Sequence, residues 1–120
     1  MRILVVDDHR DARAELAGIL ESAGHGVLLA GSVIEALEHL HRTTTDIVVA
    51  EIRMPAMSGL EAIKAIRRRD PTIFIISISG NDGGLPAHTA LTLARAFGTD
   101  RVIYRPYLPG ELLAMLRRPG

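Results

Sequence analysis

Charged and hydroxyl side chains stand at the ends of four apolar runs in this sequence. They are Asp7 and Asp8, Glu51, Ser77, and Arg105. Three neighbouring carboxylates repel one another unless a cation is present, and a hard divalent ion such as Mg²⁺ suits oxygen ligands. A hydroxyl group and a guanidinium group opposite them can hold phosphoryl oxygens. These residue types therefore indicate a metal-dependent phosphoryl site, provided that the fold brings the four ends together.

The elements that must position these residues are short apolar runs separated by segments of helical periodicity. The runs cover residues 3–6, 27–30, 47–50, 73–76 and 102–104. They lack polar alternation, which is typical of strands buried on both faces. Strands joined through helices pair in parallel through right-handed crossovers. We therefore expect one domain over residues 1–120, a doubly wound α/β fold with a five-stranded parallel sheet and five helices. In such a sheet, ligands bind beyond the carboxyl ends of the strands.

Composition excludes several classes of function. The 120 residues include 14 Lys and Arg against 14 Asp and Glu, which argues against a general binder of nucleic acids or acidic membranes. The sequence has no cysteine, which excludes disulfide frameworks, thiolate metal sites and cysteine nucleophiles. No signal-peptide pattern and no apolar run of membrane-spanning length is present. We expect a cytoplasmic protein that binds neither membranes nor nucleic acids.

Local motifs give further expectations about helix ends and loops. Ser32 with Glu35, and Ser58 with Glu61, fit capping boxes. The run 67–69 consists of three arginines at a predicted helix end, which we interpret as complementing the helix dipole. His9 is expected to face solvent.

Four stretches of the sequence resemble the receiver domain of two-component response regulators, which has a flavodoxin-like fold. They are ILVVDDH, DIVVAEIRMPAMSGLE, IFIISIS and FGTDRVIYRPY, and the resemblance covers essentially the whole chain. It implies that Asp7 and Asp8 bind Mg²⁺, together with Glu51 and the main-chain carbonyl of Arg53. Glu51 occupies the position of the aspartate that accepts a phosphoryl group from a histidine kinase.

The resemblance also assigns roles on the last two strands. Ser77 takes the place of the residue whose hydroxyl binds a phosphoryl oxygen. Arg105 stands where the family has a lysine before a proline, and the Arg105–Pro106 bond is expected to be cis. Val102 falls at the position of the family's switch aromatic.

Three of these residues depart from the family pattern. Glu51 is one methylene longer than aspartate, and a displacement of about 1 Å can slow a reaction on the order of a hundredfold. Arg105 can grip a carboxylate with two nitrogens, where lysine acts as a point charge. Val102 has no ring to rotate inward. We therefore hypothesise a degenerate receiver, in which Glu51 is a built-in negative charge paired with Arg105 and the domain acts by phosphorylation-independent protein–protein interaction, not as an enzyme.

Two other functions stay open at this point. One is a conventional phosphorelay receiver in which Glu51 is an engineered phosphomimetic residue. The other is a Mg²⁺-dependent phosphohydrolase that uses Asp7, Asp8 and Glu51, although no Asp-x-Asp nucleophile motif is present. The partner is expected to be a histidine kinase, a phosphotransfer protein or an output protein, bound through the fourth helix, the fifth strand and the last helix. A homodimer is left open.

Overall fold

A computed structural model describes residues 1–52, 59–79 and 87–117, apart from the side chains of residues 87, 88, 90, 91 and 93. Strands and helices alternate along it: β1 (Arg2–Val6), α1 (Arg10–Ser22), β2 (Gly26–Ala30), α2 (Val33–Arg42), β3 (Ile47–Glu51), α3 (Gly59–Arg69), β4 (Phe74–Ser79), α4 (Ala87–Phe97), β5 (Arg101–Tyr104) and α5 (Pro109–Met115). Arg53, the predicted cap at Ser58 and the Gly-rich stretch 80–84 lie outside the described residues.

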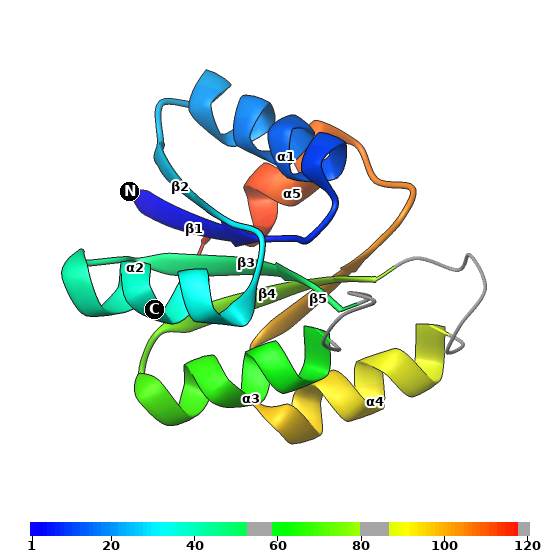
Figure 1. The fold of residues 1–120 in the computed structure, drawn as a ribbon. Helices are drawn as coiled ribbons and strands as arrows, with labels where there is room; N and C mark the ends of the chain where they lie inside the picture. The colour runs from blue at the N-terminus through cyan, green and yellow to red at the C-terminus, as the bar shows by residue number, and fades with distance from the viewer. Residues whose placement is uncertain (53–58, 80–86, 118–120) are drawn as a thin grey trace.

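The strands form one parallel sheet in the order β2-β1-β3-β4-β5. The helices α1 and α5 cover one face of this sheet, and α2, α3 and α4 cover the other (Figure 1). The predicted doubly wound α/β fold is therefore confirmed. Strand order reverses at β1, between β2 and β3, which is the place where open α/β sheets bind their ligands.

Apolar side chains from alternate strand positions fill both sides of the sheet. Leu4, Val48 and Ile75 pack with the helices α2, α3 and α4. Ile3 and Val49 point the other way, toward α1 and α5. Successive strand residues point to opposite faces. A strand that is covered on both sides therefore has apolar residues in succession instead of alternating polar and apolar residues.

Residues with special backbone or capping roles set the helix ends. Gly24 and Gly98 have φ angles of 91° and 113°, as expected for glycines that end helices. The Ser32 hydroxyl accepts a hydrogen bond from the Glu35 amide at 3.2 Å, which is half of the predicted capping box. His9 is exposed as expected, but its Nδ1 also caps α1 by accepting a hydrogen bond from the amide of Ala12 at 3.2 Å.

The prediction that the fourth strand ends at Ser77 is wrong, because β4 runs on to Ser79. Its pairing continues on both sides. The amide of Ile52 donates to the Ile78 carbonyl at 2.9 Å, and the amide of Arg105 donates to the Ser79 carbonyl at 2.8 Å. Ser77 therefore lies inside the strand, and Ser79 lies at its carboxyl end.

Candidate functional site at the carboxyl edge of the sheet

Asp7, the first residue after β1, is buried and only partly hydrogen bonded. Its Oδ1 accepts a hydrogen bond from the amide of His9 at 2.8 Å. Among the described residues, its buried Oδ2 has no hydrogen-bond partner. Burial raises the pKa of the Asp7 carboxyl, and Asp8 acts in the same direction, whereas the His9 amide and the Arg105 charge oppose the rise. A buried carboxylate oxygen without a partner is a suitable ligand for a cation.

The metal set expected from the sequence comes together only in part. Asp8 is half-buried beside Asp7 in the chain. Among the residues that the structure describes, no three His, Asp or Glu side chains converge into a metal-binding group. Glu51 forms an ion pair with Arg105. Of the expected ligands, Asp7 and Asp8 could hold a Mg²⁺ ion, and the expected carbonyl ligand of Arg53 falls outside the described residues.

Glu51 ends β3, and its side chain is only 5% exposed. Its Oε2 is paired with Nη1 of Arg105, whose side chain is 36% exposed and thus links the buried carboxylate to the surface. Arg105 follows β5 directly, and the Arg105–Pro106 peptide bond is cis, as the family resemblance implies. Removing one partner of a buried ion pair leaves an uncompensated charge, which is strongly destabilising. The pair therefore holds the end of β3 against the segment that follows β5.

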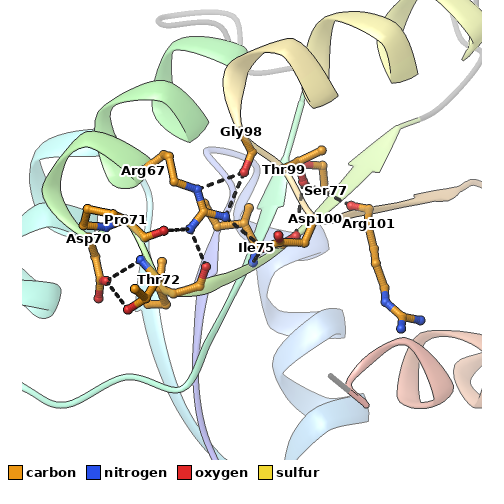
Figure 2. Close-up of polar contacts among 11 residues, drawn as sticks. Arg67, Asp70, Pro71, Thr72, Ile75, Ser77, Gly98, Thr99, Asp100 and Arg101 are labelled. Atoms are coloured by element: carbon orange, nitrogen blue, oxygen red, sulfur yellow. Dashed lines mark hydrogen bonds and ion pairs between the residues drawn. The ribbon is translucent and has the colours of Figure 1, made fainter. Parts of the chain in front are cut away.

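Two serines on β4 have opposite surroundings. The hydroxyl of Ser77 is hydrogen bonded to that of Thr99 at 2.7 Å (Figure 2). The hydroxyl of Ser79 is buried and has no hydrogen-bond partner in the described part of the chain, although the amide of Arg105 donates to the carbonyl of the same residue. Ser79, which we did not predict as a site residue, is thus the hydroxyl at the strand end next to Arg105. The signal for it in the sequence was the second serine at the same strand face.

On β5, Val102 and Tyr104 lie opposite these two serines. Val102 pairs in register with Ser77, and Tyr104 pairs with Ser79. Val102 is half-buried and packs against the core on the side of α2, α3 and α4. The aromatic residue level with the unpartnered hydroxyl is therefore Tyr104.

A cleft of about 710 Å³ opens beside the site, between α1 and the segment that leads into α5. Its lining residues are Ala12, Glu15, Leu16, Ile19, Arg105, Pro106, Tyr107 and Pro109. Burial raises the pKa of the Tyr107 hydroxyl, Glu15, Glu51 and Asp7 raise it further, and Arg105 lowers it. Arg105 thus belongs both to the ion pair with Glu51 and to the wall of this cleft.

None of the helices in the described part of the chain is both long enough and apolar enough to cross a membrane.

The fold indicates the class of protein, as comparison with solved structures shows. The structure superposes on the chemotaxis protein CheY4 of Vibrio cholerae with a TM-score of 0.84 and 26% identity, covering 96% of this chain and 94% of that one. It superposes on the receiver domain of NtrX from Brucella abortus with a TM-score of 0.85 and 27% identity, covering 94% of this chain and 92% of that one. The fold is therefore that of CheY-like receiver domains.

The sequence comparisons identify the family. The model of the response regulator receiver domain matches residues 3–117, and this chain belongs to that family. It is 33% identical to the response regulator MprA of Mycobacterium leprae over 117 residues, 98% of this chain and 50% of the relative. It is 37% identical to a response regulator receiver protein of Anaeromyxobacter sp. over 112 residues, 93% of this chain and 45% of the relative. The chain spans half or less of the length of these relatives.

Membership of this family defines the general role. Receiver domains are signalling modules of two-component systems that interact with histidine kinases or output domains, and they normally bind Mg²⁺ at the phosphorylation site.

Proposed function

We propose that residues 1–120 form a single cytoplasmic receiver domain that acts by phosphorylation-independent protein–protein interaction. The observation that carries this proposal is the ion pair between Glu51 and Arg105 at the position of the phosphoacceptor. In a working acceptor, a free carboxylate oxygen must attack phosphorus. Here that carboxylate is buried and bound to a guanidinium group, which stabilises it in place.

The length of the Glu51 side chain supports the same proposal. An acyl phosphate on Glu51 would lie about one bond farther from β3 than one on aspartate, and positioning errors of about 1 Å cost on the order of a hundredfold in rate. The guanidinium fork of Arg105 suits a carboxylate better than the point charge of a lysine would. Glu51 and Arg105 thus form a fixed charge pair that needs no phosphoryl group to hold the ends of β3 and β5 together.

The rest of the site favours a second candidate, a receiver whose machinery is complete apart from the acceptor. Asp7 Oδ2 and Ser79 Oγ are the two buried side-chain atoms without a hydrogen-bond partner among the described residues. They are the types of group that a cation and a phosphoryl oxygen would satisfy. We therefore propose that Asp7 and Asp8 hold Mg²⁺, and that Ser79 rather than Ser77 supplies the phosphoryl contact.

One experiment tests both candidates. The wild-type protein and the Glu51→Asp and Glu51→Gln variants are incubated with acetyl phosphate and Mg²⁺, and intact mass is measured. In the Glu51→Asp variant, we expect a carboxylate oxygen to attack phosphorus while acetate leaves, which gives a phosphoryl adduct. We expect no adduct on the wild type or on Glu51→Gln.

Each outcome of that experiment decides a separate point. A stoichiometric adduct on Glu51 of the wild type would overturn phosphorylation independence. An adduct on Glu51→Asp that is lost when Ser79→Ala is added, but kept when Ser77→Ala is added, would support the assignment of Ser79. The opposite dependence would return that role to Ser77.

The partner is proposed from the family and from the exposed elements around the site. We propose that a histidine kinase, a phosphotransfer protein or an output protein binds the face formed by α4, β5 and α5. The position of β5 at the edge of the sheet, between α4 and α5 in the chain, makes these three elements available together. The test is a pull-down of the partner protein with the wild type and with the Glu51→Gln variant. Equal binding by the two proteins would show that the charge on Glu51 is not needed for recognition.

A further inference from the structure

Arg67, near the C-terminal end of α3, makes more hydrogen bonds than a residue that merely complements a helix dipole (Figure 2). Its Nε and Nη2 donate to the carbonyl of Gly98 at 3.0 and 2.8 Å. Its Nη1 donates to the carbonyls of Pro71 and Ile73 at 3.0 and 2.6 Å. Its Nη2 also lies 2.8 Å from Oδ2 of Asp100. One guanidinium group thus joins α3, the start of β4, the end of α4 and the start of β5.

The acceptors of Arg67 are themselves fixed. Oδ2 of Asp100 also accepts a hydrogen bond from the amide of Ile75 at 2.8 Å, and the amide of Asp100 donates to the Ile75 carbonyl at 2.9 Å. Gly98 has a φ angle of 113°, and a Cβ at this position would lie 2.9 Å from Cγ of Arg67. The end of α4 is therefore packed against the Arg67 side chain as well as hydrogen bonded to it.

A second contact reinforces the same junction from inside the protein. The Ser77 and Thr99 hydroxyls are hydrogen bonded to each other, and both residues are buried. Thr99 Oγ1 also lies 3.2 Å from the Ile75 carbonyl and 3.1 Å from the Arg101 carbonyl. These contacts join the segment after α4 to the middle of β4.

We propose that Arg67, Asp100, Ser77 and Thr99 form an anchor that fixes the C-terminal end of α4 and makes its Gly98 end the pivot for any displacement of that helix. We call these four residues the α4 anchor. In β4, the anchor includes Ser77, whereas the site includes Ser79. The start of α4 follows β4 in the chain, and its end is held by the anchor. The inference rests on the proposed function in one respect, namely that α4 belongs to the face that partners read.

The first test compares amide hydrogen exchange in the wild type, Arg67→Lys and the control Arg68→Lys. Arg68 is the exposed neighbour on the same helix, so its substitution changes the same chemistry outside the anchor. A lysine cannot make the forked contacts of Arg67. We expect the amides of Gly98, Thr99 and Asp100 to exchange about tenfold faster in Arg67→Lys, because local opening no longer breaks these bonds. We expect Arg68→Lys to change them less than about twofold.

Unchanged exchange rates at those three amides in Arg67→Lys would overturn the proposed anchor. An equal acceleration of exchange in the buried strand β3 would also overturn it, because the effect would then not be local. If Arg67→Lys does not fold, Asp100→Asn serves instead, because it keeps the size of the side chain and removes its charge. The expected acceleration is then smaller but confined to the same amides. A uniform acceleration would again overturn the anchor.

The second test asks whether the anchor defines a pivot. Glu51→Gln is introduced with and without Arg67→Lys, and backbone amide shifts are compared along α4. With the anchor intact, we expect the amide shift changes caused by Glu51→Gln to decrease from residue 87 toward Phe97. In the Arg67→Lys background, we expect these shift changes to extend to Thr99. The same profile in both backgrounds would overturn the pivot. Phosphorylation of wild-type Glu51 would overturn the proposed function but would leave this profile unaffected, so the two failures are distinguishable.

Discussion

Ser77 and Ser79 lie on the same strand, two residues or roughly 7 Å apart, yet the surroundings of their hydroxyl groups differ. Ser77 belongs to the α4 anchor, and Ser79 belongs to the carboxyl-edge site. In the anchor, the Ser77 hydroxyl is paired with Thr99. At the site, the Ser79 hydroxyl and one oxygen of Asp7 are buried without a hydrogen-bond partner. Leaving a buried polar group unsatisfied costs about 1–3 kcal/mol.

The difference separates polar groups that are hydrogen bonded within the fold from buried polar groups that are not. The anchor uses side chains to satisfy main-chain carbonyls, and it needs nothing else. The site keeps an energetic cost that a cation or an oxyanion would remove. Among the described residues of the site, Glu51 and Arg105 form an ion pair with each other, and our proposal of phosphorylation independence rests on that pair.

The largest effect is expected from Gly59→Ala, a substitution next to the carboxyl-edge site that makes no contact with the α4 anchor. The amide of Gly59 donates to the Ile52 carbonyl at 2.7 Å, and a Cβ at Gly59 would overlap the carbonyl oxygen of Glu51 and the main chain of Ile52. Because main-chain atoms cannot move aside as a flexible side chain can, we expect a loss of about 3 kcal/mol or more in the free energy of unfolding. Urea denaturation measures it.

A matched control for this substitution is Gly18→Ala on α1, where a Cβ would meet no atom within 4 Å. Alanine is the better helix former by about 1 kcal/mol, so this variant should be as stable as the wild type or more so. Equal destabilisation by the two alanines would contradict the close packing at Gly59.

A smaller effect of opposite sign is expected from Asp7→Asn. Burial raises the pKa of Asp7, so at pH values between the unfolded and the native pKa the native state binds more protons than the unfolded chain. The free energy of unfolding of the wild type therefore falls as pH rises from the unfolded value of 3.8 to the raised native value. At neutral pH, Asp7→Asn removes this penalty and should stabilise the protein by about 1 kcal/mol, within the range common for stabilising substitutions.

Thermal unfolding measured from pH 3 to pH 8 checks this prediction. The advantage of Asp7→Asn should shrink as pH falls through the raised native pKa and disappear below 3.8, where the wild-type carboxyl is protonated in both states. Added Mg²⁺ should raise the unfolding temperature of the wild type and have less effect on the variant, because ligand binding stabilises the native state. A variant that is less stable than the wild type at neutral pH would contradict the prediction.

The sequence predicted the fold well because the three central strands, β1, β3 and β4, are buried on both faces. The run 47–50 has no polar residue, and such a run between helices has few alternatives to a central parallel strand. The end of β4 could not be predicted as well. Residues 76–79 read Ile-Ser-Ile-Ser, and nothing local shows which serine ends the strand or which one has a partner.

The residues that hydrogen bond to one another in the anchor and in the site come from distant parts of the chain. This distance limited how well the sequence could predict either region. Thr99 lies 22 residues after Ser77, and Arg67 bonds to the main chain of Gly98, 31 residues away. A hydrogen bond to a main-chain carbonyl leaves no trace in residue type, so Arg67 could not be distinguished from Arg68 and Arg69. The Glu51–Arg105 pair was predictable because both residues depart from the family pattern in a chemically complementary way.

The smallest changes in the free energy of unfolding are expected when each serine on β4 is replaced in turn by alanine. Ser77→Ala removes one partner of a buried hydrogen bond, and we expect a loss of about 1 kcal/mol in the free energy of unfolding. Ser79→Ala removes a hydroxyl that has no partner, so we expect no loss, or a gain of about 0.5 kcal/mol. The two substitutions delete the same atom from buried positions of one strand, so each is the control for the other. Equal losses in urea denaturation would mean that Ser79 is satisfied within the protein, and its hydroxyl would then have no need of a ligand.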